Sequence, residues 1–247
     1  MYFNGTIKFN NVLSSSFGLT VTEPPLVEHS AFLEAGEDVP GKNGTLFGTD
    51  KSRSSAYITV KMALHKPDNA SGYTSAAYQT ARRSIWSWLQ GTGNLVIGDV
   101  SDSHYEVQRV EITSDERQLV NYGTIEVKFT VYPYEFLDTP SKQNVTISAS
   151  GSSTFSLTTD DCEPLYEVTT GSSGGTVTIN GHTVTVAASQ SFNVDVRRRI
   201  AYSGSTDKSS VISIDYDKAG LKNGSNTIST NSGMTFKIVS SRDGYII

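Results

Sequence analysis

The residue types that most often carry catalysis are scattered along this sequence. None of the histidines belongs to an HExxH motif or a similar metal-ligand pair. The sequence has no GxSxG nucleophile elbow and no Walker-type phosphate loop. We therefore predict a protein that is not an enzyme and that has no catalytic residues, cofactor or metal site. The histidines in question are His29, His65, His104 and His182.

Two carboxylates come closest to an acid–base arrangement. Asp215 and Asp217 flank Tyr216, so on a strand both would point to one face, about 7 Å apart. Such a pair could bind a metal ion or exchange protons. Carboxylates at a strand end are more often simply solvated, and we predict solvated carboxylates here.

Two further motifs have reactive side chains but ordinary explanations. Cys162 is the single cysteine, so it cannot form an intramolecular disulfide, and its acidic neighbours argue against a reactive thiolate. The run Arg197–Arg199 would alternate between the two faces of a strand, which does not make a phosphate clamp. We interpret it as an edge-strand guard or a donor of interface salt bridges.

One α-helix is predicted between Thr74 or Ser75, which can cap its start, and Gly91, which can close it. Its apolar residues recur with the 3.6-residue period of a helix that has one buried face. They are Tyr78, Ala81, Ile85, Trp88 and Leu89.

The candidate functional residues lie on this helix. Trp86 and Trp88 point about 160° apart, so one should face the core and the other a second sheet or another molecule. Arg82 and Arg83 stand beside them, and Arg and Trp are enriched at binding hot spots. We name all four as candidate subunit-interface residues, with an ordinary solvated helix face as the alternative.

The rest of the chain has strand and turn patterns. A hairpin is expected over residues 2–9 around Asn4-Gly5, and strands over Phe17–Val21 and Ala56–Leu64. Residues 35–55 are polar with weak periodicity and predict an extended loop or arm. This first half is expected to be mostly β or α+β, with a sheet and one crossing helix.

A polar segment with a proline, Leu137–Gln143, marks the expected domain boundary. We predict domains 1–137 and 138–247. The second half contains many short strands separated by turns, which is typical of a β-sandwich or jelly roll. Its clearest hairpin is Gly175–Val186, turning at Asn180-Gly181. Strands are also expected over Phe192–Ile200 and Ser210–Tyr216.

Composition excludes several classes of protein. The 247 residues have a net charge of −5 without long single-sign runs, so the footprint of a sequence-specific nucleic-acid binder is missing. The N-terminus lacks the pattern of a signal peptide, and no apolar segment is long enough to span a bilayer. We therefore expect a soluble protein folded in a reducing compartment.

Four segments of the first half follow one another in a recognisable order: the helix end Ser84–Leu89, then Gly93–Asp99, His104–Arg109 and the strand Val127–Tyr134. With this ordered set, the first half resembles the distal tail protein (Dit) family of long-tailed bacteriophages. The second half is similar to the galectin-like β-sandwich of that family. Here the likeness lies in three short segments, Ile179–Gly181, Ile214–Asp215 and Leu221–Ile228.

The resemblance implies a structural protein of the virion, made in the host cytoplasm and placed at the tail tip. The N-terminal domains would form a ring, usually of six subunits, around a channel. The ring would join the tail-tube protein to the tail-associated fibre or lysin protein. The outward C-terminal domains would dock receptor-binding proteins. The resemblance implies no cofactor, no catalytic residues and no membrane.

A mildly acidic protein also suits a channel that viral DNA crosses without specific binding, because like charges repel. Three alternatives stay open: a carbohydrate-binding lectin, a tail-tube subunit and a glycoside-degrading enzyme. A lectin would use exposed aromatic side chains of the second half to stack on sugar rings. The candidates are Tyr202, Tyr216 and Tyr245.

Overall fold

The computed structural model describes residues 5–38, 45–65, 75–98, 102–119, 122–160 and 162–247. The chain forms two compact units, the first comprising Met1–Phe136 and Ile246–Ile247 and the second Leu137–Tyr245. Antiparallel sheets make up most of both units, and the described residues contain one α-helix. The predicted mostly-β class is confirmed.

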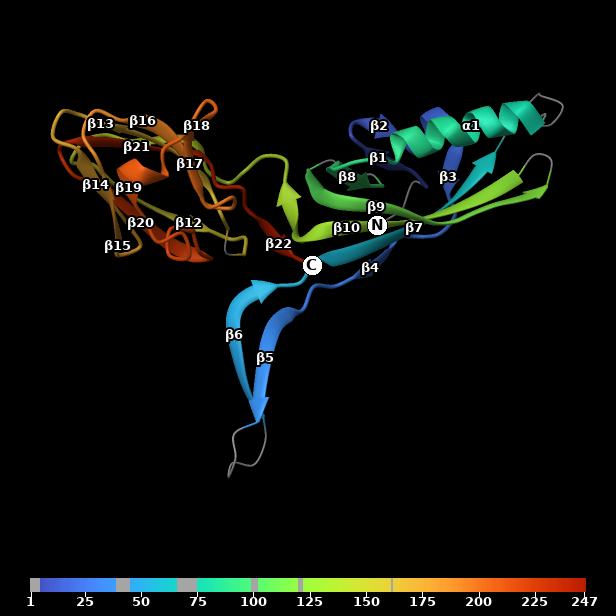
Figure 1. Cartoon of the computed structure of the whole chain (residues 1–247), viewed down its shortest axis with the longest axis horizontal. Coiled ribbons are helices and arrows are strands. Elements are labelled where there is room, and N and C mark those ends of the chain that lie inside the picture. Colours follow the sequence, from blue (N-terminus) through green and yellow to red (C-terminus); the bar gives the residue numbers. More distant parts are fainter. Residues whose placement is uncertain (1–4, 39–44, 66–74, 99–101, 120–121, 161) are drawn as a thin grey trace. The chain divides into compact units, whose positions relative to one another are not determined.

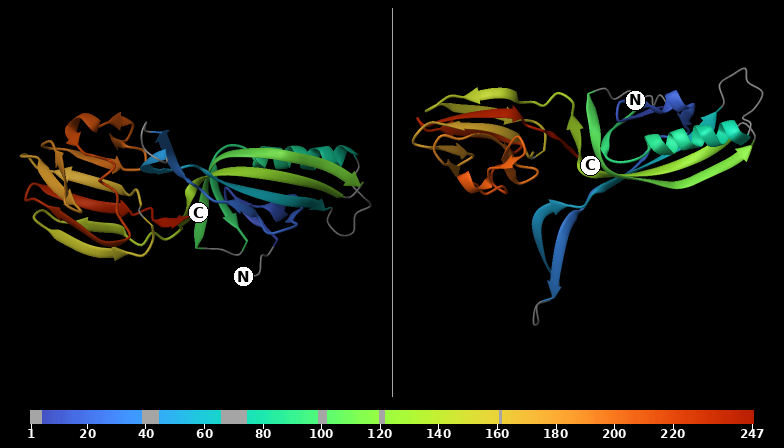
Figure 2. Two further views of the ribbon diagram at one scale, coloured as in Figure 1. Left: turned by 90° about the horizontal axis from the view of Figure 1, so that it is seen from below. Right: turned by 45° about the horizontal axis from the view of Figure 1, so that its top comes forward.

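The first unit is built on one large sheet with the order β2-β1-β8-β9-β10-β7-β3, and β4 also pairs with β7. The helix lies along one face of this sheet (Figures 1 and 2). The elements are β1 (Ile7–Phe9), β2 (Val12–Leu13), the 3-10 turn η1 (Ser14–Phe17), β3 (Leu19–Val21), β4 (Leu26–Glu28), β7 (Ala56–His65), α1 (Ser75–Trp88), β8 (Gly93–Ile97), β9 (Ser103–Leu119) and β10 (Tyr122–Leu137).

The core of the first unit lies between this sheet and α1, because both elements have one apolar face. On β7, Ile58, Val60, Met62 and Leu64 are fully buried, as the strand alternation predicts. Tyr78 and Ile85 of the helix, and Leu89 directly after it, enter the same cluster, with Ala81 and Trp88 packed against it. The helix and its buried stripe are confirmed.

The N-terminal turn differs from the prediction. The expected hairpin at Asn4-Gly5 lies partly outside the described residues. The turn that is described joins β1 to β2 through Asn10 and Asn11, whose φ angles of 51° and 65° suit the left-handed positions of a type I′ turn. The expected strand Phe17–Val21 begins only at Leu19, as β3, because Phe17 ends η1 and Gly18 adopts φ 71° and donates its N–H to the Ser15 carbonyl.

The polar segment expected to form an extended loop or arm is a β-hairpin. Strands β5 (Phe32–Asp38) and β6 (Thr45–Arg53) form a separate two-stranded sheet. At its base the Arg53 guanidinium lies 4.0 Å from the centre of the Phe32 ring, and the Ser54 N–H donates to the Ala31 carbonyl at 2.9 Å. Cross-strand pairing therefore organises a stretch whose side chains show no clear periodicity.

The second unit is a sandwich of two antiparallel sheets, ordered β11-β21-β13-β16-β17-β18 and β12-β20-β14-β15-β19. Its core combines residues from both sheets, which confirms the predicted sandwich. The elements are β11 (Gln143–Ile147), β12 (Ser152–Leu157), β13 (Leu165–Thr170), β14 (Gly175–Ile179), β15 (His182–Val186), β16 (Ser191–Asp195), β17 (Ile200–Ser203), β18 (Thr206–Asp207), the 3-10 turn η2 (Ser209–Val211), β19 (Ile212–Ser213), β20 (Gly224–Thr230) and β21 (Met234–Ser240).

The hairpin β14–β15 turns at Asn180 and Gly181 as predicted, with φ angles of 50° and 86°. The last strand, β22 (Gly244–Ile246), brings the chain back to the first unit. There Ile247 is buried, and its N–H donates to the Pro133 carbonyl at 3.1 Å.

Two predicted strands are shorter than expected. The expected strand Phe192–Ile200 ends at Asp195, whose buried carboxylate accepts the Arg198 N–H at 3.1 Å and so stabilises a turn. The run Arg197–Arg199 therefore lies in a turn and not on a strand. In the expected strand Ser210–Tyr216, only Ile212–Ser213 pair as β19, and the chain then turns, with the Lys218 N–H donating to the Asp215 carbonyl.

Candidate functional site

The carboxylate pair does not form an acid–base site. Asp215 forms a 3.0 Å ion pair with Lys218, and this hydrogen bond holds the pKa of Asp215 below its usual value. Asp217 instead pairs with Arg199. Each carboxylate thus has its own cation on an exposed turn, which agrees with the interpretation as solvated groups.

The other residues considered for reactive chemistry, Cys162 and His182, are also part of the folded structure of the second unit. Cys162 is buried, and its backbone N–H and carbonyl both bond to Leu221, so its thiol lies in the core of the second unit. The Nε2 atom of His182 accepts the Asp215 N–H at 3.3 Å. Among the described residues, no group of three or more His, Cys, Asp or Glu side chains is arranged to hold a metal ion.

The three tyrosines considered for sugar stacking come from separate elements. Tyr202 lies on β17, Tyr216 on the turn after β19, and Tyr245 on β22. Only Tyr245 is clearly exposed, and the hydroxyl oxygen of Tyr216 is buried. These three tyrosines therefore do not provide the aromatic platform expected of a lectin.

The two tryptophans of α1 point in opposite directions, as predicted. The ring of Trp88 stacks on Phe17 at 4.9 Å, and its Nε1 donates to the Phe9 carbonyl at 3.1 Å. Trp88 is therefore used within its own unit. Trp86 remains 37% exposed on the opposite side of the helix, so of the two tryptophans it is Trp86 that has the exposure an interface residue needs.

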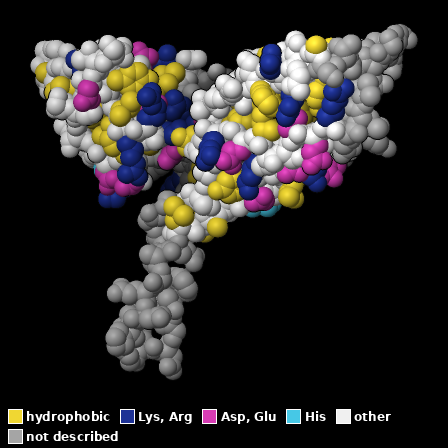
Figure 3. Space-filling view, turned by 45° about the vertical axis from the view of Figure 1, so that its right-hand side comes forward, with side chains coloured by type: hydrophobic (Ala, Val, Ile, Leu, Met, Phe, Trp, Pro, Cys, Tyr) yellow, Lys and Arg dark blue, Asp and Glu magenta, His cyan; other side chains and the backbone are white. Residues whose placement is uncertain are grey.

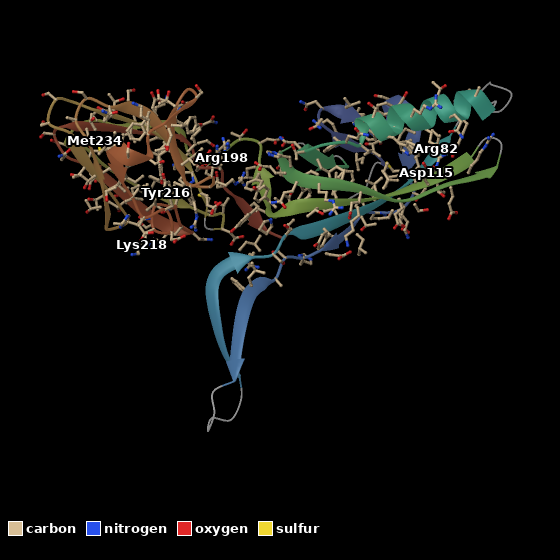
Figure 4. The ribbon with its side chains drawn as sticks, in the orientation of Figure 1. Arg82, Asp115, Arg198, Tyr216, Lys218 and Met234 are labelled. Atoms are coloured by element: carbon tan, nitrogen blue, oxygen red, sulfur yellow. The ribbon has the colours of Figure 1, made fainter. Side chains whose placement is uncertain are left out.

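Trp86 belongs to a small group of charged and aromatic side chains, the Arg82–Trp86–Asp115 cluster. Figure 4 labels two of its members, Arg82 on α1 and Asp115 on the sheet below. Asp115 Oδ2 accepts Arg82 Nε at 2.6 Å and Trp86 Nε1 at 2.9 Å. The Arg82 guanidinium also lies 4.5 Å from the centre of the Trp86 ring. The cluster therefore holds an indole and a guanidinium in fixed positions on the helix surface.

Two elements position this cluster. Arg82 and Trp86 are four residues apart, so they are neighbours on one face of α1, and the buried side of the helix locks their orientation. Asp115 comes from β9, and its side chain is only 9% exposed. Its second oxygen, Oδ1, is buried and accepts no hydrogen bond from the described residues. Arg83 is exposed beside the cluster.

A second polar cluster was not anticipated from the sequence. On β9 and β10, the Glu135 carboxylate accepts hydrogen bonds from the hydroxyls of Ser103 and Tyr105. Burial, reinforced by the Glu135 charge, raises the pKa of Tyr105 well above its usual value. These three groups satisfy one another, and the interaction is structural. Over the rest of the first unit, basic and acidic side chains are interspersed on the face seen in Figure 3.

Comparison with known proteins finds similar solved structures but no similar family description or curated sequence. Among solved structures, the chain is similar to the crystal structure of the SPP1 Dit (gp 19.1) protein, described as a paradigm of the hub adsorption apparatus in phages that infect Gram-positive hosts. The TM-score is 0.68, and the match covers 94% of this chain and 96% of that chain. This chain has the fold of a Dit protein.

The identity to SPP1 Dit is 12%, so the likeness shows the fold. It confirms at that level the resemblance drawn from the sequence motifs. The chain is also similar to a chain in the structure of the phage p2 baseplate in its activated conformation with Sr, at 12% identity over 94% of this chain and 97% of that chain. The TM-score there is 0.44. No helix among the described residues has the length and apolarity to cross a membrane.

Proposed function

We propose that this protein is a structural distal tail (baseplate hub) protein of a long-tailed bacteriophage or prophage. It assembles into a ring that joins the tail tube to the tail-tip and receptor-binding apparatus. The observation that carries this proposal is the Dit fold, which extends over 94% of the chain and so includes both units.

In this proposal the two units have different roles. Residues 1–137 form a ring, most simply of six copies, around a channel through which viral DNA passes without specific binding. Residues 138–247 form a galectin-like sandwich that provides a docking point for receptor-binding proteins. The further partners are the tail-tube protein and the tail-associated fibre or lysin protein, and the site of action is the tail tip of the virion.

The contact between copies is proposed to use the exposed side of α1 and the β5–β6 hairpin. Trp86, Arg82 and Arg83 have the residue types of binding hot spots, and Asp115 holds two of them in place. A ring needs one surface of each copy to meet a different surface of the next. A helix face and a hairpin of the same unit are two such surfaces.

The proposal is of a structural protein and not an enzyme. Two observations support it: the carboxylates of Asp215 and Asp217 are each paired with a cation, and the thiol of Cys162 is buried.

The first experiment is the solution mass and negative-stain image of the purified chain. We expect rings of about six times the 26.7 kDa chain mass, single or paired. A tail-tube subunit would instead stack into long tubes. A strict monomer at high concentration, also when the tail-tube protein is added, would contradict the ring.

The contact surfaces are tested by variants of the same protein. Trp86→Ala and, separately, deletion of residues 36–55 should prevent ring formation while the protein remains folded. Thr169→Val, an exposed substitution on the second unit and outside both proposed contact surfaces, is the control and should form rings. Intact rings from the deletion variant would exclude the hairpin, and intact rings from Trp86→Ala would exclude the cluster.

A further inference from the structure

The outward face of one sheet of the second unit has an unusual composition. In strands β12, β20, β14, β15 and β19, every outward-facing residue is Ser or Thr. We call this surface the hydroxyl face. The inward residues of the same strands, such as Val177, Val184 and Ile228, are buried in the core. Strand alternation thus separates a mainly apolar inner layer from an outer layer that displays only hydroxyl groups.

The strand register aligns these hydroxyls into rows across the sheet. One row runs from Ser152 through Ser229 and Thr178 to Thr183, and so crosses four strands. A second row joins Thr176, Thr185 and Ser213. Neighbouring strands are about 4.8 Å apart, so each row presents a hydroxyl at a spacing close to the length of one sugar ring in a polysaccharide.

The hydroxyls keep hydrogen-bonding capacity for a ligand. Thr154 and Thr227 lie 3.2 Å apart between their Oγ1 atoms, and Thr178 and Thr183 lie 3.5 Å apart. A hydroxyl has one donor and two acceptor sites, so each member of such a pair can still bond outward. The threonine methyl groups between them can contact the C–H groups of a sugar ring.

The composition of this face also narrows the class of partner. It has no outward Lys, Arg, Asp or Glu, so it offers no charge to phosphates or to a charged protein surface. Protein interfaces are enriched in aromatic residues and Arg, whereas Ser and Thr are under-represented at their hot spots. The opposite sheet is different, because its outward Lys237 and Glu167 form an ion pair at 3.5 Å.

Strand propensity does not explain the hydroxyl face. Thr is favoured in strands, but Ser is not among the residues that strands favour, and Ser occupies outward positions on β12, β20 and β19. The shared property of the face is the hydroxyl group itself.

We propose that the hydroxyl face binds an uncharged polysaccharide, which lies across the strands along the hydroxyl rows. Contact is made through hydroxyl–hydroxyl hydrogen bonds and threonine methyl groups, without aromatic stacking. The binding is weak for a single chain and insensitive to salt. This inference does not depend on ring formation.

The test is native affinity electrophoresis of the full-length protein in gels that contain a neutral β-glucan or a neutral galactomannan, compared with gels without polysaccharide. We expect at least one neutral polysaccharide to retard the protein, and the retardation to persist in about 1 M salt, where the Debye length is about 3 Å. An anionic polysaccharide is the comparator. Absence of retardation by both neutral polymers, or retardation that salt abolishes, would overturn the proposal.

Paired variants separate the hydroxyls from general surface effects. The double variant Thr178→Val with Thr185→Val keeps the side-chain shape and should weaken retardation about tenfold, since each removes a hydrogen-bonding group. Thr178→Ser with Thr185→Ser should retain most of it. Thr169→Val on the opposite sheet is the matched control. Equal retardation of the Val variant and the wild type would refute the assignment, whatever the mass measurement shows about rings.

Discussion

The two units present contrasting surfaces although the same rule builds both. In each unit a periodic apolar face is buried and the other face is left to solvent. On the helix of the first unit that outer face carries the Arg82–Trp86–Asp115 cluster, with a charged and an aromatic group held in place. On the five-stranded sheet of the second unit it carries only hydroxyls. The buried pattern thus sets the fold, and the outer residues set what each unit can bind.

The first test of this comparison is whether the two units have hydrophobic cores that unfold independently. Ile85→Ala removes a fully buried side chain of α1 and should destabilise the first unit by about 3 kcal/mol. Both tryptophans lie in this unit, so their fluorescence reports its denaturant unfolding selectively. Gln79→Ala, which is exposed, should change the free energy of unfolding by less than about 0.5 kcal/mol. A similar loss in both variants would show that the burial of Ile85 does not account for the effect.

The corresponding change in the second unit is Asp243→Ala. The buried Asp243 carboxylate accepts hydrogen bonds from the Ser141 N–H at 2.9 Å, the Ser141 hydroxyl and the Ser241 hydroxyl at 2.5 Å. Its removal leaves these donors unsatisfied and should cost about 2–3 kcal/mol. Circular dichroism should record an earlier transition while the tryptophan transition stays in place. A shift of both signals together would mean that the units unfold as one.

The same residue predicts a pH dependence confined to the second unit. Burial raises the pKa of Asp243, but the hydrogen bonds from Ser141 and Ser241 outweigh it, so its pKa lies below the usual value. A lowered folded-state pKa gives stability that is present above the unfolded-state pKa, about 3.9, and is lost as pH falls further. Unfolding measured between pH 5 and pH 2 should show this loss in the wild type. In Asp243→Asn the dependence should be smaller, and an unchanged slope would exclude Asp243 as its source.

The smallest expected effects are on the two outer surfaces. A double-mutant cycle of Arg82→Ala and Asp115→Ala should give a coupling free energy of about 1 kcal/mol in tryptophan-monitored unfolding, because the pair is partly exposed.

The double Val variant of Thr178 and Thr185 should change the free energy of unfolding by less than about 0.5 kcal/mol, since Val suits strands well. A large loss in the Val variant would mean that the hydroxyl face supports the fold and is not free to bind.

Local sequence patterns determined the elements that depend on neighbouring residues. The stripe of Tyr78, Ile85 and Leu89 predicted the helix and its buried side, because side chains three and four apart share a helix face. The alternation in Ala56–Leu64 predicted β7 and its buried residues. Asn180-Gly181 predicted its hairpin, because these residues tolerate the left-handed conformation that the turn needs.

Contacts between residues distant in the chain were decided only by the tertiary structure. Trp86 and Arg82 could be named from the sequence, but their shared partner Asp115 could not, because the packing of α1 on β9 brings it there. The strand predicted at Arg197–Arg199 was wrong because Asp195 caps a turn with its side chain.

The hydroxyl rows likewise depend partly on the sequence and partly on the tertiary structure. Alternating Thr at Thr176 and Thr178 is visible in the sequence, but the alignment of Ser152, Ser229 and Thr178 depends on strand register. Side-chain periodicity acts within one element and can be read along the chain. Register and packing bring separate elements together, and they decided which surface groups became neighbours.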